Sequence, residues 1–225
     1  MPKYKLNLVF LSGAGAVGKT SVAEELEELS TTNCAIRLVR STTRSSYAAM
    51  GIPSEKLAAD MDEHILKALQ ERIYKDYVSS LIANIARARL DRVAMLVVDR
   101  SPYDHVSYFI QLFPNLGITD IRMRVRHADN ILCNLNDDKT LVLALWFFEY
   151  PTSWSSDEHI EKDLFRRAPA AKNFVWSALL ENLIKSMPSD VIKNFKYKEV
   201  NTNNFKSPKE RAKDIYVEAF GDCSK

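Results

Sequence analysis

Short apolar runs alternate with longer amphipathic segments along the chain. Five apolar runs have the length and β-branched content of buried strands and cover residues 4–12, 34–41, 93–99, 140–150 and 195–202. Apolar residues recur at helical spacing in segments at 19–30, about 60–90, from 102, about 118–135, 171–187 and from 208. This alternation predicts an α/β fold in which helices cover both faces of a five-stranded parallel sheet.

Some of these segments carry further local signals. In the segment at about 60–90, apolar residues at steps of four predict the buried face of a long helix: Ile65, Leu69, Ile73, Tyr77, Leu81 and Ile85. The polar segment 42–58 is interrupted by Gly51 and Pro53, which predicts a loop with room for one short helix. The last helix has a capping-box pattern, because Ser207 precedes Pro208 and Glu210 closes the box.

Composition narrows the class of protein. A chain of 225 residues with 46% hydrophobic and 27% charged residues predicts one globular domain over 1–225. The net charge of +2 is too small to argue for or against a nucleic-acid partner. Three widely spaced cysteines, no signal-peptide pattern and no apolar run of roughly 18 residues predict a cytoplasmic protein without membrane contact. Whether it is a monomer or a homodimer stays open.

The stretch LSGAGAVGKTS fits the phosphate-binding pattern G-x-x-x-x-G-K-[ST], with a predicted strand before it and a helix after it. Small residues let consecutive backbone N–H groups wrap a phosphate chain, and a helix N-terminus adds its positive dipole end. We therefore expect ATP to be held by Gly13, Ala14, Gly15, Ala16, Val17, Gly18, Lys19, Thr20 and Ser21. Lys19 would reach the terminal phosphates, and Thr20 would ligate Mg²⁺. A glycine-rich turn that binds no nucleotide is the alternative.

The strand at 93–99 ends in the sequence VVDRSPYD. Asp99 could hold Mg²⁺ or accept the proton of an attacking hydroxyl, and it could instead only cap the next helix. Arg100 could clamp an anionic acceptor or neutralise charge in the transition state, or form an internal salt bridge. Ser101 and Asp104 could contact the acceptor, although an acidic residue in a first helical turn also stabilises the helix by itself.

Two further segments are candidates for the acceptor and donor sites. Arg40, Ser41, Thr42 and Arg44 have the chemistry to bind a phosphate group, and Tyr47 could form a wall for a planar base. A solvated loop and simple core packing are the alternatives for these residues. After the last strand, Asn201 and Asn203 could meet an adenine ring, or could belong to a plain polar turn.

A lid is predicted at about 152–170, where a helix would carry Arg166 and Arg167 at its far end and close over the γ-phosphate. An ordinary surface helix with a basic end is the alternative. The four histidines show no ligand spacing and receive no catalytic or metal role. The basic run Arg122, Arg124, Arg126 and His127 is predicted to be a solvated helix face, with a contact to a nucleic-acid backbone as the alternative.

Taken together, GAGAVGKT, STTR, VVDRS and the RR pair of the lid resemble P-loop kinases of nucleosides and nucleotides. The DRS element resembles the Asp-Arg-x element of thymidylate and deoxynucleoside kinases. STTR resembles the acceptor loop of guanylate kinases but lacks their second arginine. The overall layout is similar to the nicotinamide riboside kinase domain of bacterial NAD regulators and to related phage kinases.

This resemblance implies a three-layer P-loop fold with strand order 2-3-1-4-5, Mg·ATP as the phosphate donor and Asp99 as the base. It also implies that Lys19, Arg100 and the lid arginines contact the transferred phosphoryl group, and that Arg44 contacts the acceptor. Three functions stay open. The chain could be a kinase of nucleoside monophosphates or nucleosides, a kinase of hydroxymethylated pyrimidine bases in DNA, or a regulatory P-loop ATPase. A GTPase is disfavoured because no Asn-Lys-x-Asp pattern follows the fourth strand.

Overall fold

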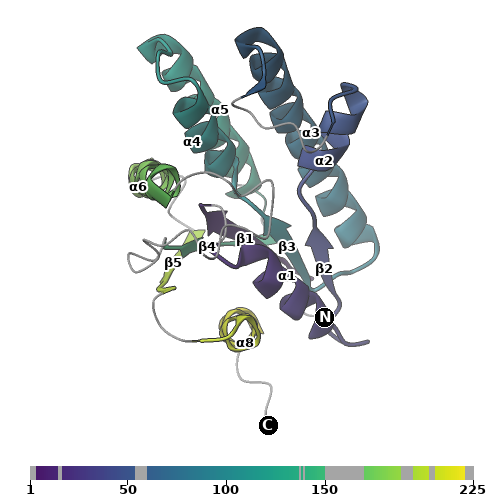
Figure 1. Ribbon diagram of the computed structural model, residues 1–225. Coiled ribbons are helices and arrows are strands. Elements are labelled where there is room, and N and C mark those ends of the chain that lie inside the picture. The colour runs from purple at the N-terminus through teal and green to yellow at the C-terminus, as the bar shows by residue number, and fades with distance from the viewer. Residues whose placement is uncertain are drawn as a thin grey trace.

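The computed structural model describes residues 4–14, 17–53, 60–136, 138, 140–149, 170–188, 195–202 and 206–220. Five parallel strands form one sheet in the order β2-β3-β1-β4-β5 (Figure 1). The strands are β1 (Leu6–Gly13), β2 (Ile36–Val39), β3 (Met95–Asp99), β4 (Leu141–Phe148) and β5 (Phe195–Val200). All five predicted strands are present, and the expected strand order is confirmed.

Helices cover both faces of this sheet, as expected for parallel strands joined by right-handed crossovers. They are α1 (Lys19–Glu28), α2 (Thr43–Ala49), α3 (Glu63–Leu90), α4 (Pro102–Leu112), α5 (Ile118–Asn136), α6 (Ala170–Lys185) and α8 (Pro208–Phe220). α1 and α8 pack against each other on one face, whereas α3, α4, α5 and α6 lie on the other (Figure 1). The short helix α2 occupies part of the segment predicted as a loop and packs on α3.

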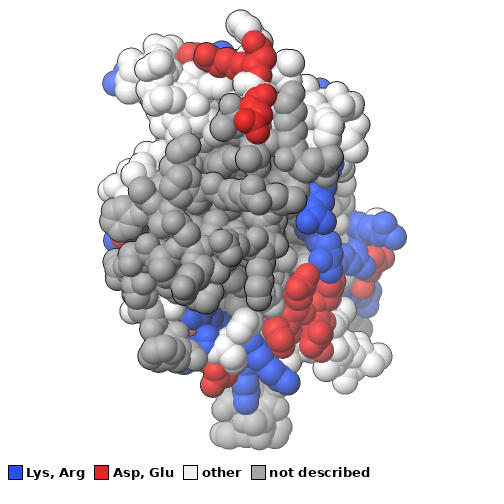
Figure 2. Space-filling model, viewed as in Figure 1, with Lys and Arg blue, Asp and Glu red and all other residues white. Residues whose placement is uncertain are grey.

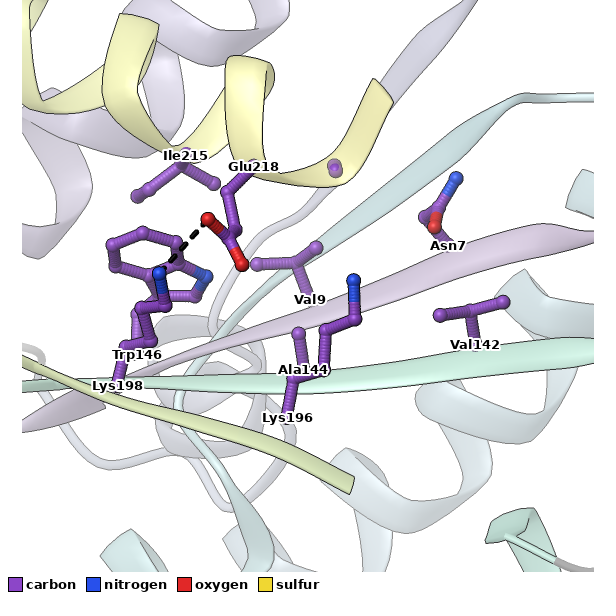
Figure 3. A pocket seen from close by; sticks show the side chains of 10 residues that line it. Asn7, Val9, Val142, Ala144, Trp146, Lys196, Lys198, Ile215 and Glu218 are labelled. Atoms are coloured by element: carbon purple, nitrogen blue, oxygen red, sulfur yellow. Dashed lines mark ion pairs between the residues drawn. The ribbon is translucent and has the colours of Figure 1, made fainter. Parts of the chain in front are cut away.

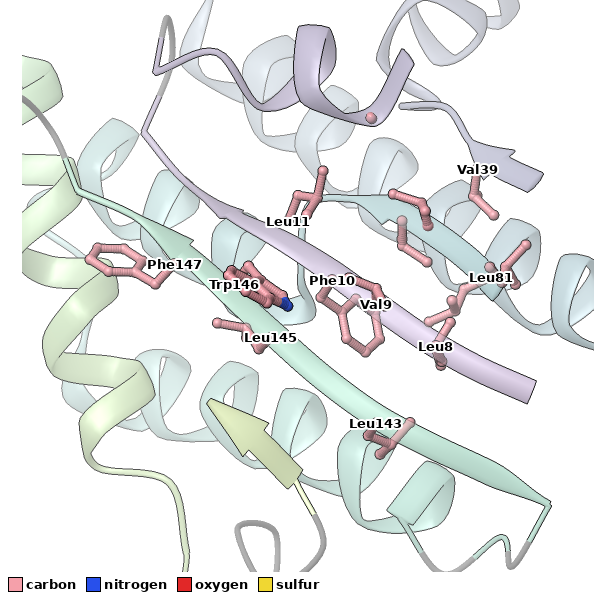
Figure 4. Close-up of a cluster of buried hydrophobic side chains, with 14 of the residues drawn as sticks. Leu8, Val9, Phe10, Leu11, Val39, Leu81, Leu143, Leu145, Trp146 and Phe147 are labelled. Carbon is pink, nitrogen blue, oxygen red and sulfur yellow. The ribbon is translucent and has the colours of Figure 1, made fainter. Parts of the chain in front are cut away.

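The core follows the two central strands. Every residue of β1 except Asn7 is buried, because helices cover both sides of this middle strand. Leu8 and Phe10 of β1 lie beside Leu143 and Leu145 of β4 (Figure 4). Each such fully buried side chain contributes roughly 1.5–3 kcal/mol of burial free energy, so the sheet provides a rigid support for the loops at its edge.

The buried face of α3 differs from its prediction at one position. Leu69, Ile73, Tyr77, Leu81 and Ile85 are buried, but Ile65 is 45% exposed and its neighbour Leu66 is buried instead. A step of four residues exceeds the 3.6-residue turn by about 40°, so a run of such steps rotates away from the core. The step of three from Leu66 to Leu69 restores the alignment.

The carboxyl ends of β1, β3 and β4 meet at one edge of the sheet. Leu11 of β1 pairs with Asp99, and Gly13 pairs with Phe148 at the end of β4. Loops that leave these strands are therefore neighbours in space, which is where open α/β sheets bind ligands. In the described ranges, no helix has the length and apolar character needed to cross a membrane.

Candidate active site

The glycine loop connects the end of β1 to the start of α1, and two of its glycines have left-handed backbone conformations. Gly13 has φ +142°, and a Cβ added there would lie 2.6 Å from the backbone oxygen of Phe148. Gly18 has φ +85° and occupies the N-cap of α1, where it has no side chain to cover the helix start. The first N–H groups of a helix have no intrahelical acceptor, so this end is suited to an anion.

Lys19 begins α1 and is buried against the loop backbone. Its ammonium donates hydrogen bonds to the carbonyl oxygens of Gly13 at 2.8 Å and Ala14 at 2.5 Å. A bound phosphate would compete with these two carbonyls for the ammonium. Val17 anchors the loop by packing into the core. Gly15 and Ala16 lie outside the described residues, and Ser21 is an exposed residue of the first turn of α1.

The structure brings Thr20 and Asp99 together. The Thr20 hydroxyl donates a hydrogen bond to Asp99 Oδ2 at 3.2 Å. The second carboxylate oxygen, Oδ1, is buried and has no hydrogen-bond partner among the described residues. Hydroxyl and carboxylate oxygens are the hard donors that Mg²⁺ prefers, so this pair fits the ion. No three His, Cys, Asp or Glu side chains converge within the described part of the chain, so phosphates and water would supply most of the metal's ligands.

Asp99 does not cap the helix that follows it. Ser101 is the N-cap of α4, and its hydroxyl accepts the N–H of Asp104 while the Asp104 carboxylate accepts the N–H of Ser101. Both Ser101 and Asp104 are 0% exposed. The polar groups of both residues are used inside the protein, and the capping box fixes the corner after Asp99. Their predicted contacts with the acceptor stay predictions that these bonds do not support.

Arg100 has an unusual backbone and an ordered side chain. Its backbone φ is +93°, a conformation that residues other than glycine rarely adopt. Two hydrogen bonds hold the backbone on either side of this residue: the Arg100 N–H donates to the Leu11 carbonyl at 3.0 Å, and the Tyr77 hydroxyl donates to the Arg100 carbonyl at 3.1 Å. The guanidinium lies 5.2 Å from the ring centre of Trp176 and 4.0 Å from an oxygen of Asp104. Strained backbone at a strand end is typical of functional sites.

The predicted acceptor segment has a mixed outcome. Arg40 is exposed and forms ion pairs with Glu24 at 3.2 Å and Glu27 at 3.5 Å, both on α1. Figure 2 shows acidic side chains over α1 with basic side chains beside them. The Arg40 guanidinium is thus shared with two carboxylates, which gives its predicted role in phosphate binding no support. Arg44 is exposed in the first turn of α2.

The other residues of that segment build α2 and its contact with α3. Thr42 is the N-cap residue of α2, and its hydroxyl donates to the Ile73 carbonyl at 3.4 Å. The hydroxyl of Ser41 lies 2.9 Å from that of Thr43. Tyr47 is buried with Leu69 and Ile73, which favours the core-packing alternative for this side chain and gives its predicted role as a base wall no support.

An aromatic group beside Asp99 was not predicted. It consists of Tyr74 and Tyr77 on α3, His105 and Tyr108 on α4, and Trp176 on α6. The His105 ring centre lies 4.3 Å from that of Tyr77 and 5.8 Å from that of Tyr74, and the ring centres of Tyr108 and Trp176 are 5.0 Å apart. Tyr74 with Tyr77, and His105 with Tyr108, stand at the i, i+3 spacing of one helix face, which is a signal visible in the sequence.

This aromatic group contains buried polar atoms without partners. Tyr74 Oη and His105 Nε2 have no hydrogen-bond partner among the described residues. Burial lowers the pKa of His105 to about 3, the Arg100 charge adds to this effect, and the Asp99 charge opposes it. Burial also raises the pKa of Tyr74 well above its ordinary value. The histidine and the tyrosine are therefore neutral near pH 7.

One predicted solvated residue is packed instead. The Arg124 guanidinium on α5 lies 3.3 Å from the ring centre of Phe109 and pairs with Glu71 of α3, and its side chain is only 18% exposed. The prediction of a freely solvated face is wrong for this arginine, because the apolar stem of an arginine can cover a neighbouring ring.

Several predicted residues cannot be placed. The lid at 152–169, with Arg166 and Arg167, and also Asn203 lie outside the described residues. Asn201 is exposed directly after β5, and the neighbouring Thr202 hydroxyl donates to the Glu149 carbonyl at 2.7 Å. These roles stay predictions.

A small cavity lies elsewhere, between the sheet and α8 (Figure 3). Its volume of about 20 Å³ is enough for a single water molecule. Lys198 and Glu218 form an ion pair at 2.8 Å beside it, and Trp146 and Ile215 add apolar lining. It is too small for a nucleotide, so the candidate active site is the edge of the sheet where Asp99 meets Thr20.

The strand order and the strand–glycine loop–helix unit define the fold of the P-loop kinases. No protein-family model matches the sequence, and none of the curated proteins compared with it matches.

Solved structures do match. The thymidylate kinase from Candida albicans superimposes with a TM-score of 0.53 at 10% identity, over 95% of this chain and 92% of that one. A NadR protein in complex with NR superimposes with a TM-score of 0.57 at 13% identity, over 97% of this chain. The match covers 51% of the NadR chain, so this protein spans about half of it.

Proposed function

We propose that the protein is an ATP-dependent kinase whose acceptor is a nucleoside monophosphate or a nucleoside, with deoxynucleotides preferred. The observation that carries this proposal is the contact between Thr20 and Asp99 at 3.2 Å, with Asp99 Oδ1 buried and without a partner among the described residues. This contact joins the start of α1, next to the glycine loop, to the Asp99 carboxylate, whose second oxygen has no hydrogen bond within the described residues and could bind a metal ion or accept a proton.

On the donor side, the loop amides and the N-terminus of α1 would bind the phosphates of ATP, and Lys19 would exchange its two carbonyl contacts for phosphate oxygens. Thr20 and Asp99 would hold Mg²⁺, directly or through water. The ion would neutralise the charge that develops on the phosphates during transfer. The chain's own contribution is positioning, because phosphoryl transfer needs in-line geometry more than covalent catalysis.

On the acceptor side, Asp99 would accept the proton of the attacking hydroxyl of a nucleoside, whereas a nucleoside monophosphate would attack through a phosphate oxygen that has no such proton to lose. Arg100 would contact the transferred group or an acceptor phosphate. The neighbouring rings favour a planar acceptor: Tyr74, Tyr77 and His105 pack together where Tyr77 bonds the Arg100 carbonyl, and Tyr108 packs on Trp176 beside the Arg100 guanidinium. The unpartnered Tyr74 hydroxyl and His105 nitrogen would suit the polar edge of a base. Arg44 is proposed as a further phosphate contact of the acceptor.

The test is an acceptor screen with γ-labelled ATP that includes nucleosides, all nucleoside monophosphates, and DNA containing hydroxymethylated pyrimidines. We expect label on a mononucleotide or nucleoside. Label on DNA alone would replace this acceptor class, and binding to DNA would then weaken steeply as salt rises. ATP hydrolysis without transfer to any acceptor would instead indicate a regulatory ATPase and contradict the proposal.

A further inference from the structure

The carboxylate of Asp104 joins two segments that are far apart in the sequence. Its Oδ1 accepts the N–H of Gly13 at 3.0 Å, and its Oδ2 accepts the hydroxyl of Ser12 at 2.5 Å. The same Oδ2 accepts the N–H and the hydroxyl of Ser101, both at 2.7 Å. These contacts, here called the Asp104 clamp, fix the start of the glycine loop to the corner that follows β3.

Helix capping explains the bonds of Asp104 to Ser101, but not its bonds to Ser12 and Gly13. The box of Ser207 and Glu210 on α8 has the same local pattern, with the Glu210 carboxylate accepting the Ser207 N–H at 2.7 Å and its hydroxyl at 2.8 Å. Both of those residues are exposed, and the hydrogen bonds of the box stay within the start of α8. The Asp104 carboxylate is buried and additionally bonds two residues of β1, which a helix cap does not need.

We infer that Asp104 is a positioning residue that sets the nucleotide-binding loop against Asp99. The backbone of Gly13 is held on both sides of its Cα, with its N–H bound by Asp104 and its carbonyl bound by Lys19 at 2.8 Å. A phosphate that takes over the Lys19 ammonium removes the second contact, so the clamp then holds Gly13 through its N–H alone. Ser101 stands two residues after Asp99. The Asp104 carboxylate therefore fixes both the glycine loop and the corner that follows β3, where Asp99 lies. The catalytic part of this inference rests on the proposed function.

The test compares D104N, S12A and the matched control E210Q. In D104N the side chain has a single acceptor oxygen, so either the Gly13 N–H or the Ser101 N–H faces an amide donor. We expect the dissociation constant of a fluorescent Mg·ATP analogue to rise about tenfold in D104N, the effect of one lost buried hydrogen bond. S12A should show a smaller rise, and E210Q should lower the melting temperature without changing nucleotide affinity.

Amide hydrogen exchange on the ligand-free protein gives a second readout that needs no nucleotide. The Gly13 amide should exchange faster in D104N and S12A than in wild type, and at the wild-type rate in E210Q. Affinities of D104N and S12A within about twofold of wild type, together with unchanged Gly13 exchange, would overturn the inference. If D104N does not fold, S12A decides, because it keeps the carboxylate and its remaining donors. A wild-type protein that binds no ATP analogue would refute the proposed function, while hydrogen exchange would still decide the clamp.

Discussion

The Thr20 hydroxyl on α1 donates a hydrogen bond to the Asp99 carboxylate at the end of β3, with 3.2 Å between Oγ1 and Oδ2. The two side chains meet because β1, which leads into the glycine loop, pairs with β3 so that Leu11 stands opposite Asp99. The contact uses only one carboxylate oxygen. Asp99 Oδ1 is left buried and without a partner among the described residues, so one side chain could serve both the metal and the acceptor.

Replacing Asp99 with asparagine tests the second of these tasks. With a nucleoside as acceptor, Asn cannot accept the proton of the attacking hydroxyl, so D99N should lower kcat by about 10²–10⁴-fold, the range of general-base catalysis. Nucleotide binding should change little, because the loop backbone and Lys19 supply most contacts with the phosphates. Steady-state kinetics and titration with an ATP analogue separate the two effects. Turnover within about tenfold of wild type would exclude Asp99 as the base.

Thr20 tests the first task, the binding of Mg²⁺. The isosteric variant T20V removes the hydroxyl, whereas T20S keeps it. We expect the Mg²⁺ concentration for half-maximal activity to rise about tenfold in T20V, since a lost oxygen ligand weakens this ion's site. T20S should stay close to wild type. Equal Mg²⁺ dependence in all three proteins would show that Thr20 does not ligate the metal.

Gly13 is expected to tolerate no side chain. Its φ of +142° is confined to glycine, and a Cβ would lie 2.6 Å from the Phe148 oxygen of β4. G13A should therefore lower the free energy of unfolding by about 2–4 kcal/mol. G51A is the matched control, because Gly51 has φ +65° but nothing within 4 Å of its added Cβ. It should cost about 1–2 kcal/mol, the strain of a left-handed conformation alone. Urea unfolding measures both, and an equal loss would contradict the steric argument.

The sequence was sufficient for the sheet and for the glycine loop because both depend on local signals. Apolar runs define the strands, and Gly13 to Thr20 form a contiguous motif. The strand order came from the family resemblance. The capping box of Ser101 and Asp104 was also within reach, because it repeats the pattern at Ser207 and Glu210. The bonds from Asp104 to Ser12 and Gly13 were not, because they depend on how β1 lies beside the start of α4.

The aromatic group beside Asp99 could not be predicted in the same way. Tyr77 was assigned to the core, and His105 had no ligand spacing, yet their ring centres are 4.3 Å apart. That contact depends on how α3 and α4 pack across the sheet, which no short stretch of sequence determines. The ion pair of Arg40 with Glu24 was missed for the same reason, because it joins the residue that follows β2 to the neighbouring helix α1.

Arg100 provides a test that separates backbone strain, which changes stability, from the guanidinium group, which changes activity. Its φ of +93° strains any residue except glycine, so R100G should unfold with a free energy about 1 kcal/mol higher than R100A. Both variants lose the guanidinium and its contact with Trp176, so both should lose the same large part of kcat. Denaturant unfolding and kinetics of the pair are the measurements. A more stable R100A would show that this backbone is not strained.

His105 should make the protein less stable in mild acid. Its pKa is lowered from 6.5 to about 3, mainly by burial, with the Arg100 charge in the same direction and the Asp99 charge against it. The unfolded chain therefore binds one more proton than the folded chain between these two values, and stability falls as the pH drops from about 6.5 towards 3.

The variant H105Q should remove this dependence, because glutamine does not titrate. Between pH 7 and pH 5, wild type should lose about 1–2 kcal/mol of unfolding free energy more than H105Q does. H64Q is the matched control for the substitution itself, because His64 is exposed at the start of α3. The comparison between variants also cancels the opposite contribution of Glu149, whose pKa is raised by burial and by Glu199. Parallel unfolding curves for wild type and H105Q across this pH range would mean that folding leaves the pKa of His105 unshifted, and would contradict its burial as a neutral ring.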